Sequence, residues 1–77
     1  MSTVEITESA RRHGVRDADI RHAVRHLLRQ WPMDDGFTMI VGPAQDGQLL
    51  EIGVNANDVI IHAMRARRKY LEGREQR

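Results

Sequence analysis

The hydrophobic pattern of this chain changes period once, and that change limits the folds available to it. Apolar residues first recur at the spacing i, i+3, i+4, i+7 and i+8, which marks one face of a helix: Ile20, Ala23, Val24, Leu27 and Leu28. Beyond Gly36 only short β-prone runs remain, and turn residues separate them. A chain that is helical first and then built of strands is typical of a small α+β domain, with helices packed on an antiparallel sheet.

Two helices are expected in the N-terminal part. Thr7 is a suitable N-cap for a short first helix, and Gly14 provides its stop. The second helix is expected to begin at Asp17, where an acidic side chain favours the helix dipole. It is expected to end at Trp31, because the residue before a proline avoids the α conformation. The apolar stripe of this helix would then cover one face of the sheet.

A hairpin is expected to follow the helices. Residues 37–41 and 49–54 are β-prone, and between them lie Asp46 and Gly47. This dipeptide suits the positive φ angles of a tight hairpin turn. The two segments are therefore predicted to be neighbouring antiparallel strands.

The last part of the chain predicts a further strand and a short helix. Residues 59–64 are mostly apolar and follow a turn at 55–58, so they are expected to form a central strand that is buried on both faces. A basic helix is expected over residues 65–71, with Gly73 as its stop. The sheet then has three strands, or four if residues 4–6 add a short edge strand.

The composition excludes several classes of protein. The 77 residues include no cysteine, which rules out disulfides and thiolate metal sites, and the length favours a single domain over residues 1–77. No apolar run approaches the roughly 20 residues that a membrane helix needs. The N-terminus lacks the basic and apolar regions of an export signal, so a cytoplasmic location is expected. A small chain without disulfides relies on packing or on a partner, which leaves a homo-oligomer open.

Charge is unevenly distributed along the chain. Residues 1–30 carry six Arg and four acidic residues, and residues 59–77 carry six basic and two acidic residues. The segment between them carries five acidic residues and no Lys or Arg. Arginine binds phosphate through two parallel hydrogen bonds and keeps its charge, so two basic segments that converge would form a phosphate-binding face.

His62 is the most unusual residue of the last predicted strand. It alternates onto the same face as Ile60 and Met64, and four cations follow it closely in sequence: Arg65, Arg67, Arg68 and Lys69. A histidine beside guanidinium groups suits metal-free cleavage of RNA, in which the 2′-hydroxyl loses a proton and arginine stabilises the charged phosphate. A hydrogen-bonded histidine on a sheet face is the structural alternative.

The other histidines and Tyr70 have structural alternatives as well. His13 ends the first helix, where it is either a second proton-transfer group or a simple partner of the helix dipole. Tyr70 either stacks on a base, donates a proton or covers the core. His22 and His26 have the i, i+4 spacing of a metal site, but neighbouring arginines disfavour a cation, so they are expected on a solvated basic face.

The N-terminal helices also permit a DNA-binding interpretation. Ala10, Gly14 and Ile20 have the relative spacing of a helix-turn-helix. Asp17 and Asp19 argue against it, because they would place carboxylates in the first turn of the recognition helix, against the DNA phosphates. The alternative function is therefore a non-catalytic module that binds nucleic acid or a regulatory protein partner.

Two segments carry a family resemblance. Residues 12–15 read R-H-G-V and precede an acidic helix start. Residues 59–64 read V-I-I-H-A-M and lead into a basic segment that ends at Tyr70. These segments resemble the K-H-G-V signature, the strand reading roughly R-I-I-S-A-R and the basic C-terminal helix of BrnT-type toxins, the ribonucleases of bacterial toxin–antitoxin pairs.

The resemblance implies a RelE-like fold, cleavage of RNA without a metal or other cofactor, and neutralisation by a cognate antitoxin, often a ribbon-helix-helix protein. His62 stands at the family's serine position and Met64 at that of the following arginine, so Arg65 is taken as the substitute. The candidates for the chemical step are His62, His13 and Arg65, of which His62 rests on its chemistry alone. The candidates for binding RNA phosphate are Arg12, Arg67, Arg68, Lys69 and Tyr70.

Overall fold

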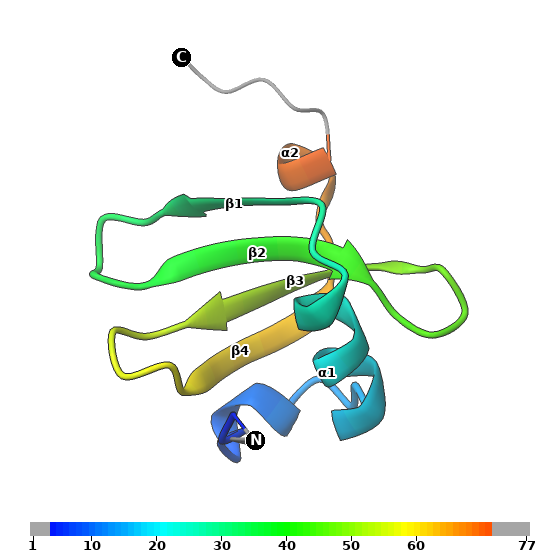
Figure 1. Ribbon diagram of the computed structural model, residues 1–77, viewed down its shortest axis with the longest axis horizontal. Helices are drawn as coiled ribbons and strands as arrows, with labels where there is room; N and C mark the ends of the chain where they lie inside the picture. The colour runs from blue at the N-terminus through cyan, green and yellow to red at the C-terminus, as the bar shows by residue number, and fades with distance from the viewer. Residues whose placement is uncertain (1–3, 72–77) are drawn as a thin grey trace.

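A four-stranded antiparallel sheet with the order β1-β2-β3-β4 forms the centre of the fold (Figure 1). The computed structural model describes residues 4–71. The strands are β1 Arg29–Pro32, β2 Thr38–Pro43, β3 Leu49–Val54 and β4 Ile60–Arg65. Each strand turns directly into the next, so the sheet is a simple meander. The α+β class and the antiparallel sheet are confirmed, and β1 is a strand that the sequence pattern did not predict.

The helical elements are shorter than the pattern predicts. They are a single 3₁₀ turn, η1 Ser9–Arg11, the helix α1 Asp17–Arg25 and the short helix α2 Arg68–Leu71. The predicted C-terminal helix therefore begins three residues later than expected, and its predicted stop, Gly73, lies outside the described residues. Within residues 4–71 no helix has the length and apolar character needed to cross a bilayer.

The prediction that α1 continues to Trp31 was wrong. The helix ends at Arg25, and the backbone N–H of Leu28 donates to the carbonyl of Val41 at 2.8 Å, which starts the pairing of β1 with β2. Leu27 and Leu28 are 36% and 64% exposed, so they do not belong to the apolar stripe. Pro32 is accommodated because β1 is an edge strand, where a missing N–H breaks no ladder bond.

The N-terminal segment lies along the outer edge of β4. Ile6 forms an isolated parallel bridge with Ile60, so the predicted edge strand is reduced to one residue pair. The hydroxyls of Thr7 and Ser9 donate to the carbonyls of Ile60 and Ile61 at 3.0 and 3.1 Å. The predicted central position of this last strand was therefore wrong, because β4 is the final strand of the sheet and η1 covers its edge. These contacts hold η1 against the sheet, so no helix-turn-helix forms.

Both predicted turns form where the sequence places them, although in the first only Gly47, and not Asp46, has a positive φ angle. Gly47 has φ +92° in the turn between β2 and β3, a value that a side chain would strain. In the turn between β3 and β4 the side-chain oxygen of Asn55 accepts the N–H groups of Asn57 and Val59 at 2.9 and 3.1 Å. Asp58 there has φ +63°, in the left-handed region that Asp tolerates better than most residues.

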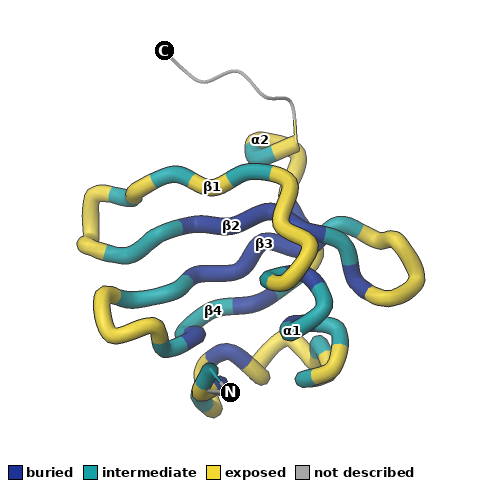
Figure 2. Tube along the Cα trace, in the orientation of Figure 1, coloured by how far each residue is buried: buried dark blue, intermediate teal, exposed yellow. Residues whose placement is uncertain are grey.

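The two faces of the sheet are covered by different parts of the chain. On one face α1 packs Ile20 and Ala23 against Ile40 of β2 and Ile52 of β3, and all four are buried. Burial is concentrated in β2 and β3, while the turns are exposed (Figure 2). On the other face the segment after β4 leads to α2 beside β1, at the opposite edge from β4 (Figure 1).

Gly42 allows α1 to approach the sheet. A Cβ atom at this position would collide with the backbone carbonyl oxygen of Ala23 and lie 2.9 Å from its carbonyl carbon. The backbone of α1 therefore contacts β2 directly at Gly42. This contact sets the distance between the helix and the sheet, and so the space for the core side chains between them.

We expect Gly42→Ala to lower the free energy of unfolding by about 1–3 kcal/mol, because the obstructing atoms are backbone and cannot rotate away. Urea unfolding followed by circular dichroism measures this. Gly47→Ala is the matched control: its Cβ meets open space and its cost is backbone strain alone, about 1 kcal/mol. Equal losses in the two variants would contradict the close approach of α1.

Candidate functional site

A buried carboxylate lies in the middle of the sheet face opposite α1. Glu51 is in β3, between Val41 of β2 and Met64 of β4 in the register. It is 0% exposed, although its neighbours in sequence, Leu50 and Ile52, point to the core on the other face. A buried charge is costly unless hydrogen bonds and an opposite charge compensate it.

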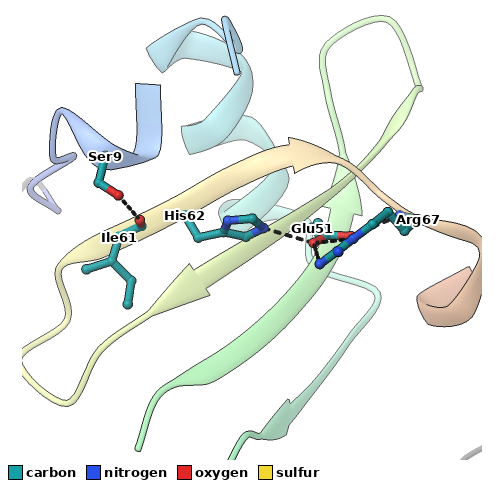
Figure 3. Close-up of polar contacts among 5 residues, drawn as sticks. All are labelled: Ser9, Glu51, Ile61, His62 and Arg67. Carbon is teal, nitrogen blue, oxygen red and sulfur yellow. Dashed lines mark hydrogen bonds and ion pairs between the residues drawn. The ribbon is translucent and has the colours of Figure 1, made fainter. Parts of the chain in front are cut away.

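Arg67 and His62 supply this compensation from two sides (Figure 3). The Arg67 side chain donates from Nη2 to Oε2 of Glu51 at 2.8 Å and from Nε to both oxygens at 3.1 and 3.2 Å. The backbone N–H of Arg67 donates to Oε1 at 2.9 Å. The Nε2 atom of His62 lies 2.8 Å from Oε2. Glu51, His62 and Arg67 are named the carboxylate cluster below.

The carboxylate cluster keeps Glu51 ionised. Burial raises the pKa of Glu51, but the hydrogen bonds from the side chain and backbone of Arg67 and from His62 together outweigh it and leave the pKa below its usual range. The same hydrogen bond to Glu51 raises the pKa of Arg67, so both partners carry their charge at neutral pH.

The ionised carboxylate decides which nitrogen of His62 carries a proton. An ionised carboxylate only accepts hydrogen bonds, so Nε2 of His62 must be the donor at 2.8 Å. In the neutral ring this leaves Nδ1 as the basic nitrogen. The side chain of His62 is 28% exposed, so the ring is accessible while its orientation is fixed. The ring of His13 meets it edge-on, with ring centroids 6.0 Å apart.

The local sequence explains how these groups meet. Residues 51 and 53 of β3 point to the same face, and Gly53 pairs with His62, so the missing side chain leaves room for the imidazole. A Cβ on Gly53 would lie 3.1 Å from that of His62 and 3.3 Å from the ring of Phe37. After β4 the N–H of Ala66 donates to the carbonyl of Leu49 at 2.9 Å, and this last pairing directs the next residue, Arg67, over Glu51.

The structure brings together some of the predicted site residues. His62 and Arg67 belong to the carboxylate cluster, and His13 lies beside it. Lys69 and Tyr70 lie on α2, where the Lys69 ammonium is 5.1 Å from the centroid of the Tyr70 ring. The remaining predicted phosphate ligands, Arg12 and Arg68, are exposed.

Arg65 does not join the carboxylate cluster. It pairs with Leu50, whose side chain is in the core on the α1 face, whereas His62 pairs with Gly53 on the opposite face. Its guanidinium lies 3.0 and 2.9 Å from the side-chain oxygen of Gln48 when that amide is oriented to accept. The prediction grouped Arg65 with His62 by closeness in sequence, but three positions along a strand reverse the face.

Glu51 was missed by the sequence reasoning, although a signal for it exists. It is the acidic residue inside an otherwise apolar strand, and acids are almost never fully buried unless they are paired. A buried acid on a central strand therefore predicts a cationic partner on a neighbouring segment.

The N-terminal histidine pair has a structural role. The rings of His22 and His26 are 4.4 Å apart between centroids, and Nδ1 of His22 lies 2.8 Å from the carbonyl oxygen of Pro43. His22 therefore links α1 to β2. The prediction that it lies on a simply solvated face was wrong. Within residues 4–71 no group of three or more potential ligands among His, Cys, Asp and Glu is arranged to hold a metal ion.

The carboxylate cluster lies outside the hollow that the structure shows on the other face. That hollow has a volume of about 530 Å³ and is lined by Val24, Ile40 and Val54, among others. It includes none of the three cluster residues. The cluster is therefore not part of that hollow, and it reaches solvent through the side chains of His62 and Arg67, which are 28% and 48% exposed.

No family model, curated protein or solved structure matches this chain. The resemblance to BrnT-type toxins therefore rests on the short motifs alone.

We expect Arg67→Met to destabilise the fold by about 3 kcal/mol, because it leaves the Glu51 carboxylate buried without its cation. Urea unfolding at neutral pH measures the loss. Arg12→Met is the control, since it removes the same charge from an exposed position and is expected to change stability by less than about 0.5 kcal/mol. Equal stability of the two variants would show that Arg67 does not compensate Glu51.

The lowered pKa of Glu51 also predicts an acid-dependent loss of stability. A carboxyl whose pKa is lower in the folded state stabilises the fold above the unfolded pKa of about 4.3, and that contribution is lost as the pH falls through the folded pKa. Glu51→Gln should therefore show a shallower loss of stability than the parent between about pH 6 and about pH 2. Urea unfolding midpoints measured across this pH range test the prediction. Glu5→Gln, at an exposed position, is the control. Parallel stability curves for Glu51→Gln and the parent would contradict the lowered pKa of Glu51.

Proposed function

We propose that this chain is a metal-independent endoribonuclease with a RelE-like fold, acting as the toxin of a toxin–antitoxin pair. The observation that carries the proposal is the His62 imidazole, whose Nε2 is held at 2.8 Å by the buried, ionised carboxylate of Glu51. A histidine oriented by a buried carboxylate is an arrangement that proteins use for proton transfer. The motif resemblance to BrnT-type toxins separately favours a ribonuclease, although His62 stands at the family's serine position and rests on its chemistry alone.

In the proposed reaction His62 acts as the base and His13 as the acid. Nδ1 of His62 accepts the proton of the RNA 2′-hydroxyl, and the 2′-oxygen attacks the adjacent phosphorus. The bond from phosphorus to the 5′-oxygen breaks, and a protonated His13 gives its proton to that oxygen. The products are a 2′,3′-cyclic phosphate and a 5′-hydroxyl.

The other groups of the site hold the imidazole and the phosphate. Glu51 fixes the tautomer and stabilises the imidazolium that forms, so it is a positioning residue. Arg67 holds Glu51 through Nε and Nη2, and its side chain is still 48% exposed, so it can also face the phosphate. Arg12, Arg68 and Lys69 are exposed and bind further phosphates of the RNA in this proposal. Arg65 has no part in the chemical step, because it lies on the α1 face.

The biological setting follows from the same proposal. A nuclease that cuts the RNA of its own cell is harmful, so it needs a neutralising antitoxin, for which a ribbon-helix-helix protein is the expectation. Its substrate places it in the cytoplasm. A non-catalytic binding module remains the alternative that the assay below separates from an enzyme.

We expect the purified protein to cleave single-stranded RNA in the presence of EDTA and to leave 2′,3′-cyclic phosphate ends. His62→Gln should slow cleavage by about 100-fold or more, because it removes the base and keeps the polarity. His26→Gln, at the exposed end of α1, is the matched control and should cleave like the parent. Growth after induction in a bacterial host provides the second readout, with arrest expected for the parent and relieved by His62→Gln.

Loss of cleavage in EDTA would refute the metal-independent mechanism, and an unchanged rate in a folded His62→Gln variant would refute His62 as the base. RNA that is bound but uncut would refute the enzyme. The last of these would favour the non-catalytic module.

A further inference from the structure

An aromatic pair lies on the same sheet face as the carboxylate cluster, at the opposite edge. The rings of Trp31 in β1 and Tyr70 in α2 are 5.4 Å apart between centroids and tilted by 41°. Both residues are half-buried, so part of each ring remains accessible. The pair is named the Trp31–Tyr70 surface below.

The strand register connects the Trp31–Tyr70 surface to His62. Trp31 pairs with Met39, Met39 pairs with Gly53, and Gly53 pairs with His62. Directly paired residues share a face, so these four positions form one row across the sheet. Three strand intervals separate the ends of the row, which is about 14 Å. A polymer bound at His62 can therefore reach Trp31 with a neighbouring nucleotide, while the nucleotide being cleaved stays at His62.

Two cations lie over the Tyr70 ring of the pair. The Arg67 guanidinium carbon is 5.4 Å and the Lys69 nitrogen 5.1 Å from the centroid of the Tyr70 ring. Aromatic rings beside a cationic groove are how proteins hold single-stranded nucleic acid, because every base has a face that can stack and every linkage has a charge. A duplex hides those base faces within its own stack.

We propose that the Trp31–Tyr70 surface is a base-stacking subsite for a nucleotide next to the scissile linkage, and that the substrate is single-stranded RNA. Lys69 faces the phosphate of that nucleotide. The proposal rests on the proposed function, since it takes the carboxylate cluster as the cleavage site. Arg67 then serves both halves of the site, because it touches Glu51 and the Tyr70 ring.

Trp31 is the single tryptophan of the chain, so its fluorescence reports on this subsite directly. The probes are two short 2′-O-methyl oligonucleotides, which lack the nucleophilic hydroxyl and cannot be cut. One is an adenylate oligomer, and the other has the same length and charge but no bases. We expect the adenylate oligomer to quench Trp31 and to bind about tenfold more tightly than the abasic one, which leaves the emission unchanged.

Substitutions at Tyr70 and Trp31 test whether this surface causes the preference for the adenylate oligomer. Tyr70→Ala should remove the tenfold preference for the adenylate oligomer over the abasic one, and Tyr70→Phe should keep the preference because it retains the ring. Trp31→Phe should abolish the fluorescence signal and retain binding, measured by anisotropy of a labelled oligomer. The comparison of the two oligomers on the parent protein needs no variant, so a folding defect in Tyr70→Ala does not weaken the test.

Equal affinity for the two oligomers, or equal quenching by a duplex of the same sequence, would overturn the subsite. Because the probes cannot be cut, the result is independent of catalysis. Quenching without cleavage of ordinary RNA would refute the nuclease and leave the stacking surface in place, whereas cleavage without quenching would refute the stacking surface alone.

Discussion

The buried carboxylate of Glu51 is the constraint on which the sheet face opposite α1 depends. A charge that is 0% exposed needs several donors, and here they come from separate parts of the chain: His62 in β4 and Arg67 in the segment after it. Compensating one charge therefore fixes the orientation of the imidazole and holds the segment directly after β4 against the sheet. The same interaction that stabilises the fold orders the candidate site.

Much of the fold follows from local sequence rules. The segment 49–54 was predicted with its observed bounds, and the turn at Asp46 and Gly47 formed as expected, because turn chemistry is local. The rules failed at residues 26–32. Leu27 and Leu28 continue the helical spacing, but a tertiary hydrogen bond to Val41 pulls this segment into β1. Periodicity alone cannot show that the neighbouring strand offers a better partner.

The site divides in the same way. His62 was found because a histidine is unusual in a strand of β-formers, whereas Arg67 was found as one cation of the basic C-terminal segment and was predicted to bind phosphate, not a carboxylate. Glu51 was not found, because its importance comes from burial, and burial depends on which face of β3 is covered. Arg65 was misplaced because closeness in sequence was read as closeness in space, although alternation puts it behind the sheet. The register between neighbouring strands determines which side chains lie together in this site, and the pattern of a single sequence does not specify that register.

The row from Trp31 through Met39 and Gly53 to His62 limits how this protein can evolve. Inserting or deleting a single residue within β2 or β3 would turn every following side chain of that strand to the opposite face and break the row. Changes of length are tolerated in the exposed turns instead. Relatives of this chain should therefore differ in length between the strands and share a fixed strand length, whatever residues fill the positions between.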